Sequence, residues 1–497
     1  MNPVLRHLGQ LALVGAASAL CLVSPTQLRA APDPDGGLAR GYFRQLKLQP
    51  ATVSDSGARG QNLVVIVIDA LRPDHTSAYG YRRPTTPFLE TLAEESLVFV
   101  NAYANAPWTR PATTSMLTGL LPSAHRTQSD RSKLPAAVTT VAQELKKLGY
   151  RTAAVVGNGN AGRIAGLDRG FDDFADTVTH WDGLPTAANV YDEAIEWLRH
   201  KRPTDQPWFL FVFLVDPHDP YHAPPEYERL WLGQHKGEPR RRVHWEYKNK
   251  IPRRERDAMI ALYDASLRYT DDQTRRFVDE LKRLKVYDQT SLMLTADHGE
   301  AFGEHGYYLH AYHHTDEFLR VPLIMRSPSL RGAGHVFPLA QSVDLAPTLI
   351  DLAGGTPRAG LHGQSLVSLV KAPVDPLRIA VSEYNEFGIR RSALFNLRHK
   401  VILQLPADRE SFHQRIPRAE YLPSVSFDRE VLQAYDRLTD PFEKKDLAAG
   451  ELPATTRAMR DELRAYMLSA PSPNHEVDLE TMPKSLVDDL RSLGYVQ

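Results

Sequence analysis

Residues 63–69 read LVVIVID, an apolar and mostly β-branched run that ends on a carboxylate. Four similar runs follow along the chain and are interpreted as strands: 151–156, 209–215, 291–294 and 321–325. The stretches between them are amphipathic, and helices are expected at 137–148, 187–200, 257–285 and 344–353. Strands that alternate with helices are typical of a mainly parallel sheet covered by helices on both faces.

The composition is that of a globular protein with balanced charge. Of the 497 residues, 42% are hydrophobic and 24% are charged. The 59 basic residues are balanced by 60 acidic ones. Because the formal net charge is only −1, no global field favours nucleic acid or an anionic membrane as a partner. Any charge on a substrate must therefore be balanced locally.

Residues 1–31 have the layout of a secretory signal peptide, with cleavage expected near Ala30 or Ala31. The apolar run from Leu8 to Val23 is shorter than the ~20 residues that span a bilayer, so a membrane anchor is the less favoured alternative. We expect a periplasmic or secreted protein whose mature form has no membrane span. The only cysteine, Cys21, lies in this leader, which excludes cysteine chemistry in the mature chain. A linker is expected at 32–58.

Polar residues close two of the predicted strands. Asp69 ends the first run, and Asp297 and His298 end the run at 291–296. In an open α/β sheet, ligands bind at the carboxyl ends of the strands. Two carboxylates and an imidazole that converge there can hold a divalent cation, whereas a single Asp after a strand is often only a helix cap.

Residues 108–119, WTRPATTSMLTG, are expected to form a short helix. Pro111 suits the first turn, and Gly119 suits the end. Thr109 would then lie at the helix N-terminus, where free N–H groups and the helix dipole favour an anionic ester. By position alone, a simple N-cap is the favoured interpretation of Thr109.

Four ordered segments resemble the sulfatase family of the alkaline phosphatase superfamily: DALRPDH at 69–75, the Thr109–Gly119 segment, DPHDPY at 216–221 and DHGEAFGEHG at 297–306. Shorter matches at 320–324, 344–348 and 436–441 extend the resemblance over roughly residues 61–450. It implies an alkaline phosphatase-like α/β fold with a mixed, mainly parallel sheet sandwiched by helices. The catalytic domain would span 59–370, and a smaller C-terminal α+β subdomain with a helical tail would span 371–497.

The resemblance also implies the residues of a metal site. Its ligands would be Asp69, Asp297, His298 and Thr109, with Thr109 also the nucleophile. Three oxygen ligands and one imidazole suit Ca²⁺, Mn²⁺ or Zn²⁺ about equally. A second metal is not favoured, because it would need another cluster.

Several further histidines are assigned in the same way. His218 and His310 are expected to face the substrate, and only His222 beside them offers ligands for a second metal. His313 and His314 are expected on a helix surface.

The departures from the family pattern are as informative as the matches. Sulfatases proper carry a Cys or Ser that becomes formylglycine, with an Arg four residues later, and here those positions hold Thr109 and Thr113. A threonine cannot yield that aldehyde, so water must cleave the Thr109 ester, and phosphorus esters are favoured over sulfate esters. Asn158 and Asn160 replace a Lys and a His, and they are expected to hydrogen-bond the ester oxygens.

The sequence thus predicts an exported, metal-dependent hydrolase that acts on a small-molecule, glycan or lipid ester. Two alternatives stay open: a transferase that passes a phospho-group to a glycan or lipid, and a catalytically silent binding protein. Residues 236–256 hold nine Lys or Arg against three acidic residues, with Trp245 and Tyr247 among them. They are interpreted as a solvated loop, with a flap over an acidic substrate as the alternative.

Overall fold

The structure is a computed structural model that describes residues 48–177, 186–233, 239–241, 251–415 and 425–473. The predicted signal peptide, most of the predicted linker, residues 474–497 of the predicted C-terminal unit, and Trp245 and Tyr247 lie outside the described residues.

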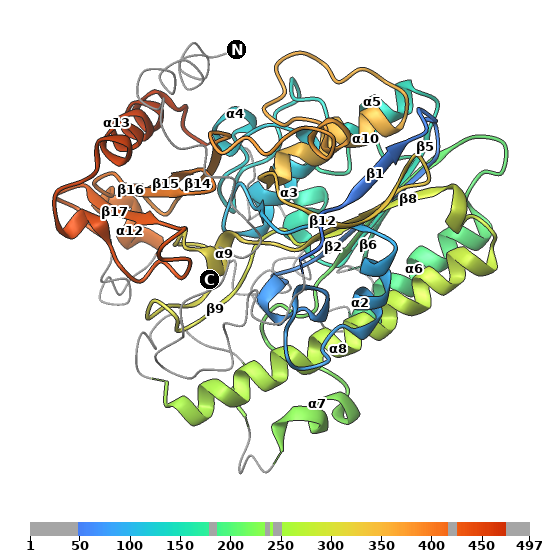
Figure 1. Ribbon diagram of the computed structural model, residues 1–497, viewed down its shortest axis with the longest axis horizontal. Coiled ribbons are helices and arrows are strands. Elements are labelled where there is room, and N and C mark those ends of the chain that lie inside the picture. The colour runs from blue at the N-terminus through green and yellow to red at the C-terminus, as the bar shows by residue number, and fades with distance from the viewer. Residues whose placement is uncertain (1–47, 178–185, 234–238, 242–250, 416–424, 474–497) are drawn as a thin grey trace.

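A nine-stranded mixed sheet forms the centre of the molecule (Figure 1). In sheet order its strands are β1 (Thr52–Asp55), β12 (Leu330–Val336), β3 (Leu97–Phe99), β11 (Leu323–Arg326), β8 (Thr290–Thr295), β2 (Asn62–Ile68), β7 (Trp208–Leu214), β5 (Arg151–Val156) and β6 (Asp173–Asp176). All five strands predicted from the sequence are present. The strand β2 lies between β7 and β8 and is parallel to both, while β11 runs antiparallel to β8. The predicted mixed, mainly parallel sheet is confirmed.

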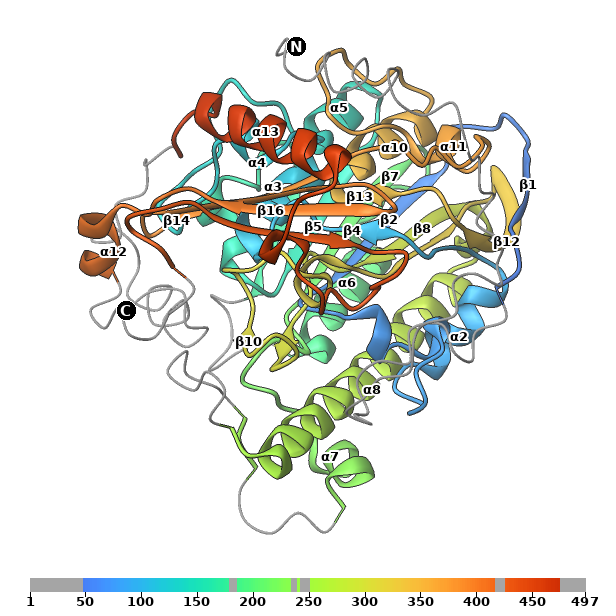
Figure 2. The same cartoon turned by 60° about the vertical axis from the view of Figure 1, so that its left-hand side comes forward.

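Helices cover both faces of this sheet (Figure 1, Figure 2). One layer contains α2 (Pro87–Glu94), α6 (Ala187–His200) and α8 (Arg253–Arg283). The other contains α3 (Thr109–Thr118), α5 (Val141–Lys147) and α10 (Leu345–Leu352). Because β2, β7 and β8 are covered on both sides, their residues are buried almost without interruption.

The basic segment 236–256 is not a loop throughout. Its last four residues form the first turn of α8, which begins at Arg253 rather than at the predicted residue 257. Pro252 precedes the helix with φ −56°, a conformation that suits a helix start. The amphipathic pattern did not reveal this turn, because Arg253 and Arg254 are exposed and none of its four residues is buried.

The predicted C-terminal α+β unit is also confirmed. An antiparallel sheet of β14 (Ala380–Glu386), β15 (Ile389–Phe395), β16 (His399–Gln404) and β17 (Val431–Asp436) lies at the left of Figure 1. The helix α13 (Ala454–Ser469) packs on it through Met459, Leu463 and Met467. Residue 371 as the domain boundary stays a prediction.

His313 and His314 are not on a helix surface, so that prediction is wrong. His314 is fully buried, and the helix that follows, α9 (Asp316–Leu319), has only four residues. Arg391 of the C-terminal sheet lies 2.9 Å from Nδ1 of His313. The segment lies under that sheet, which no local pattern in the sequence could reveal.

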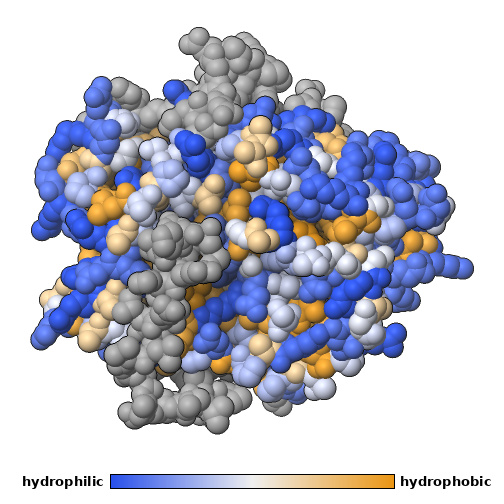
Figure 3. Space-filling model, turned by 90° about the horizontal axis from the view of Figure 1, so that it is seen from above, coloured by the Kyte–Doolittle hydropathy of each residue, from blue (hydrophilic) through white to orange (hydrophobic). Residues whose placement is uncertain are grey.

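Among the described residues, no helix has the length and the apolar character that crossing a membrane requires. Hydrophilic residues cover most of the face seen in Figure 3, and apolar residues are scattered among them.

A buried carboxyl group joins the C-terminal sheet to its surroundings. Glu383 of β14 accepts hydrogen bonds from the backbone N–H of Ser123 (2.8 Å), from the Ser123 hydroxyl (3.1 Å) and from the hydroxyl of Tyr466 on α13. Burial raises the pKa of Glu383 to about 7. Since an unfolded glutamate ionises near pH 4.5, the folded protein holds this proton more tightly than the unfolded chain.

We expect Glu383→Gln to remove one pH dependence of stability. Between pH about 4.5 and 7 the unfolded chain releases the Glu383 proton first, so the free energy of unfolding falls as the pH rises. Relative to wild type, Glu383→Gln should therefore gain up to about 3 kcal/mol between pH 5 and pH 8. Urea unfolding at both pH values measures this, with the exposed Glu451→Gln as control. An equal difference at both pH values would contradict the burial argument.

Candidate metal centre and active site

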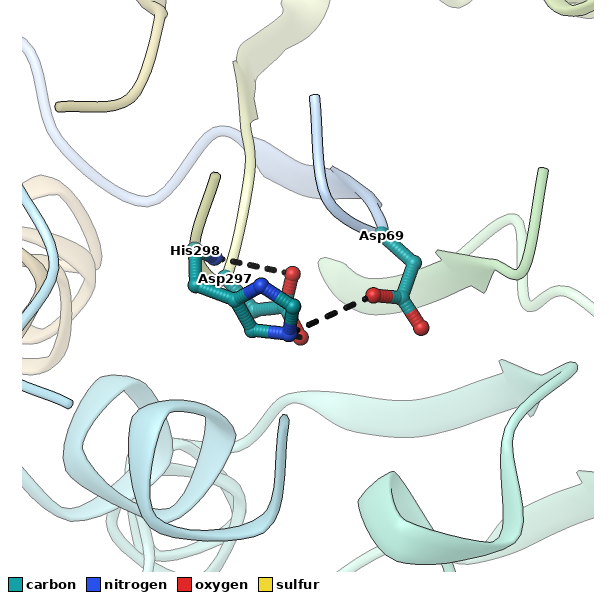
Figure 4. A group of neighbouring side chains, drawn as sticks. All are labelled: Asp69, Asp297 and His298. Carbon is teal, nitrogen blue, oxygen red and sulfur yellow. Dashed lines mark hydrogen bonds and ion pairs between the residues drawn. The ribbon is translucent and has the colours of Figure 1, made fainter. Parts of the chain in front are cut away.

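Three predicted ligands meet at the carboxyl ends of two neighbouring strands of the central sheet. Asp69 follows β2, and Asp297 and His298 follow the neighbouring parallel strand β8. Their side chains point toward one another (Figure 4). Nε2 of His298 lies 3.5 Å from Oδ1 of Asp69 and 3.3 Å from Oδ2 of Asp297. Asp69, Asp297 and His298 are all fully buried.

Hydrogen bonds around these side chains fix which atoms face the centre. Oδ1 of Asp297 accepts the backbone N–H groups of Ala70 (3.2 Å) and His298 (2.9 Å). Nδ1 of His298 lies 2.8 Å from the carbonyl oxygen of Gly299, and because a carbonyl can only accept, Nδ1 carries the proton. The bare Nε2 of His298 and Oδ2 of Asp297 are therefore left facing Asp69.

The donor set fits a divalent cation. Oδ1 of Asp69 and Oδ2 of Asp297 are buried oxygens without a hydrogen-bond partner, which is rare in proteins. Together with the bare nitrogen of His298 they place three electron-rich atoms within 4.8 Å of one another. Two hard oxygens and one imidazole suit Ca²⁺, Mn²⁺ or Zn²⁺. In the described parts of the chain, no other group of three or more such side chains has this geometry.

Burial disturbs the ionisation of all three groups. Burial, followed by the nearby Asp297, raises the pKa of Asp69 well above its usual value. Burial likewise raises the pKa of Asp297, and it lowers that of His298 to about 3. Without a counter-ion the two carboxyl groups would tend to hold protons, so cation binding is expected to displace them.

Thr109 lies against this centre at the start of α3. The preceding residue, Trp108, is extended, and the helix ends at Gly119 with φ 68°, as the sequence predicts. The Thr109 hydroxyl is fully buried and lies 3.3 Å from Nε2 of His298. A hydroxyl that donates to this bare nitrogen places its oxygen next to the carboxylates. The free N–H groups of the helix start lie beside it.

The two histidines expected at the substrate lie beside the ligand histidine. The ring centroids of His298 and His310 are 4.4 Å apart, and those of His310 and His218 are 4.8 Å apart. Nδ1 of His218 lies 2.6 Å from the carbonyl oxygen of Asp219. Burial lowers the pKa of His310 to about 3. His222, by contrast, is exposed and contacts Glu228 at 3.6 Å, so it is not part of the group formed by His298, His310 and His218.

The two asparagines expected at the ester form hydrogen bonds within the protein. The side-chain N–H of Asn158 donates to Oδ2 of Asp69 (2.8 Å). The side-chain oxygen of Asn160 accepts two hydrogen bonds from Arg110, one from Nε (3.0 Å) and one from Nη2 (2.7 Å). Asn158 therefore orients a metal ligand, and contact of either asparagine with a substrate stays a proposal.

Sequence reasoning did not single out two buried residues next to the site. Arg110 follows Thr109 but points away, toward Asn160 and the backbone oxygens of Ser129, Asp130 and Ser132. Glu300, two residues after His298, places Oε1 3.3 Å from Nδ1 of His310. In the sequence, the only signal for Glu300 is its place in the DHGE segment. The only signal for Arg110 is that it follows Thr109.

Comparisons with known proteins identify the family of the chain. The sulfatase family model matches residues 61–355. A choline-sulfatase of Rhizobium meliloti (strain 1021) is 27% identical over 380 residues, which cover 62% of this chain and 71% of that protein. An iduronate 2-sulfatase of Mus musculus is 26% identical over 396 residues, which cover 65% and 69%.

Two solved structures share the fold. The phosphonate monoester hydrolase of Agrobacterium radiobacter aligns with a TM-score of 0.63 at 20% identity and covers 82% of this chain and 95% of its own. A protein solved in complex with its substrate D-glucosamine-2-N,6-O-disulfate aligns with a TM-score of 0.68 at 18% identity, covering 84% and 99%.

Proposed function

The chain belongs to the sulfatase family and is an ester-hydrolysing enzyme, and from this premise we propose that it cleaves a phosphate, phosphonate or sulfate ester through a covalent intermediate on Thr109. The observation that carries the proposal is the 3.3 Å contact between the Thr109 hydroxyl and the ligand nitrogen of His298. The N-cap of α3 is Trp108 rather than Thr109, so an N-cap role does not account for this contact. A catalytically silent binding protein would have no use for Thr109, Asp69, Asp297 and His298 in one place.

The residues of the site have distinct parts in this reaction. A divalent cation held by Asp69, Asp297 and His298 would lower the pKa of the Thr109 hydroxyl and polarise the ester. Oγ1 of Thr109 loses its proton to solvent and attacks the phosphorus or sulfur atom. The bond from that atom to the ester oxygen breaks, and this oxygen leaves with a proton from His310 or His218, which later regains a proton from solvent. Water then attacks the same central atom, which releases the anion and restores the Thr109 hydroxyl.

The histidines can supply that proton because of where they lie. A bound anionic ester favours the protonated form of either imidazole. The bonds at Nδ1 described above fix the rings of His310 and His218 and thereby orient their Nε2 atoms. The N–H groups at the start of α3 stabilise the charge that develops on the ester oxygens.

Phosphorus esters are favoured over sulfate esters, as the replaced residues suggest. Thr109 cannot become an aldehyde, and the buried Thr113 and Asn158 stand where sulfatases proper have cations. After burial and the neighbouring Asp297, the carboxyl groups of Glu300 and Asp219 also raise the pKa of Asp69, so any charge that they carry adds negative potential at the site. We therefore propose an ester with a single negative charge, such as a phosphodiester or a phosphonate monoester, rather than a phosphate monoester dianion.

A panel of aryl esters tests this proposal. Phosphodiester, phosphonate, phosphate and sulfate esters of one phenol are assayed with Mn²⁺, Zn²⁺ or Ca²⁺ and after chelation. We expect metal-dependent turnover that is fastest with the phosphodiester or the phosphonate. Turnover of sulfate esters alone, or turnover that survives complete metal removal, would contradict the proposal. Acceleration by an added alcohol, with transfer of the group to it, would favour the transferase alternative.

We also propose that the protein acts in the periplasm or outside the cell. The support is the leader sequence at residues 1–31 and the absence of cysteine after it. An intact Met1 on the isolated protein, found by mass spectrometry, would contradict export with cleavage.

A further inference from the structure

We infer that Glu300 is a positioning residue, which holds the ring of His310 so that Nε2 of His310 faces the ester. The role of His310 toward the ester rests on the proposed function. The contact between Glu300 and His310 does not, and it can be tested without a substrate.

The three histidines of the site are oriented in the same way but by different groups. In His298 and His218, Nδ1 contacts a backbone carbonyl oxygen, of Gly299 at 2.8 Å and of Asp219 at 2.6 Å. In His310, Nδ1 contacts the side chain of Glu300 at 3.3 Å. A bond at one ring nitrogen fixes the ring and presents the other nitrogen. Glu300 is thus an orienting group that a substitution can remove.

The backbone holds Glu300 and His310 opposite each other. Two short antiparallel strands, β9 (Ala301–Phe302) and β10 (Tyr308–Leu309), pair Leu309 with Ala301. Glu300 and His310 lie one residue beyond the pair of Ala301 and Leu309, and their side chains are in contact there. The contact therefore follows from the fold of the hairpin rather than from a flexible side chain.

The chain around the pair is constrained on both sides. Leu309 and Ala311, which flank His310, have φ of 65° and 98°, a region that costs energy for residues other than glycine. The backbone N–H of Ala311 donates to the carbonyl oxygen of Pro107 (2.9 Å), next to Trp108 and Thr109. The backbone oxygen of Glu300 accepts from Arg72 (2.6 Å). Such strain persists only where surrounding contacts impose it, which fits a part of the chain that must place one ring accurately.

Burial of Glu300 also calls for a role. Its side chain is fully buried, and burying a carboxyl group is unfavourable unless it is hydrogen-bonded. Either charge state of Glu300 can bond to Nδ1 of His310, as acceptor or as donor. Glu300→Gln preserves both possibilities, whereas Glu300→Met keeps the length and removes the strong hydrogen bond.

The test compares Glu300→Gln, Glu300→Met, His310→Ala and the double variant Glu300→Met/His310→Ala, all loaded with metal and checked for metal content. We expect Glu300→Met to lower kcat by about 10- to 100-fold with little change in KM. Glu300→Gln should stay within a few-fold of wild type. The double variant should be no slower than His310→Ala, because Glu300 acts through His310.

Two further readouts separate positioning from a structural defect. With a nitrophenyl leaving group, which needs little protonation, the loss in Glu300→Met should be smaller than with an alkyl leaving group. The ¹⁵N resonances of the His310 ring, assigned by their absence in His310→Ala, should report one bonded state in wild type and in Glu300→Gln and an altered one in Glu300→Met.

An equal loss in the His310→Ala background would overturn the inference, and so would unchanged His310 resonances in Glu300→Met. A loss that does not depend on the leaving group would also overturn it. If no ester is turned over by wild type, the proposed function fails, while the ring resonances still decide whether Glu300 positions His310.

Discussion

Thr109→Ala is expected to lower turnover of the best ester by roughly 10³-fold or more, because the reaction loses its covalent route rather than one hydrogen bond. Thr109→Ser should keep part of the activity, since a primary hydroxyl can occupy the same place beside His298. Steady-state kinetics of both variants measure this. Thr114→Ala is the matched control, because Thr114 is buried in the same helix and its hydroxyl donates to the backbone oxygen of Arg110 (2.7 Å). An Ala variant at position 109 with full activity would refute the mechanism.

Thr109→Cys separates this site further from that of sulfatases proper. In a host that carries the formylglycine-generating enzyme, this change supplies a candidate cysteine. Thr113 and Asn158 remain where an Arg and a Lys would be needed, and both are fully buried. We therefore expect little sulfatase activity from Thr109→Cys alone.

Asp69→Ala and Asp297→Ala are each expected to abolish metal retention, leaving less than roughly a tenth of an equivalent after gel filtration. One carboxylate, one imidazole and the neutral Thr109 hydroxyl leave too little negative charge among the ligands for a divalent cation. Elemental analysis of the purified variants measures the metal content. Asp173→Ala is the control, because Asp173 lies at the far edge of the same sheet and pairs with Arg151 at 2.9 Å.

The fold of these two variants should survive. Burial and mutual repulsion raise the pKa of Asp69, so its removal relieves an unfavourable contact in the metal-free protein. Metal-free Asp69→Ala should accordingly resist urea at least as well as metal-free wild type at neutral pH. Variants that bind metal like the parent would contradict the assignment of this centre.

The parts of the fold that could be predicted are those with a strong local pattern. The long buried strands β2, β5, β7 and β8 appear in the sequence as uninterrupted apolar runs. The strands β3 and β12 could not be recognised. The former has three residues, and the latter contains Gly332, where a side chain would collide with the backbone oxygen of Thr52. Strand pairing with a distant segment, not local propensity, makes β12 a strand.

The same distinction applies to the site. Asp69, Asp297 and His298 were accessible to sequence reasoning because they directly follow strands that neighbour each other. Two other contacts of the site, Arg110 with Asn160 and Glu300 with His310, depend on the conformation of loops. The second contact forms at a hairpin whose strands have only two residues each. His314 was misplaced for the same reason, since the sheet that buries it lies more than 60 residues away in sequence.

The most direct test of the central claim is to trap the covalent intermediate. Enzyme is mixed with a fast aryl ester, quenched in acid, digested and analysed by mass spectrometry. We predict one phosphoryl, phosphonyl or sulfuryl group on the peptide that contains Thr109, and no such adduct in Thr109→Ala. An adduct on any other residue, or full turnover by wild type with no adduct under conditions that capture the burst, would contradict Thr109 as the nucleophile.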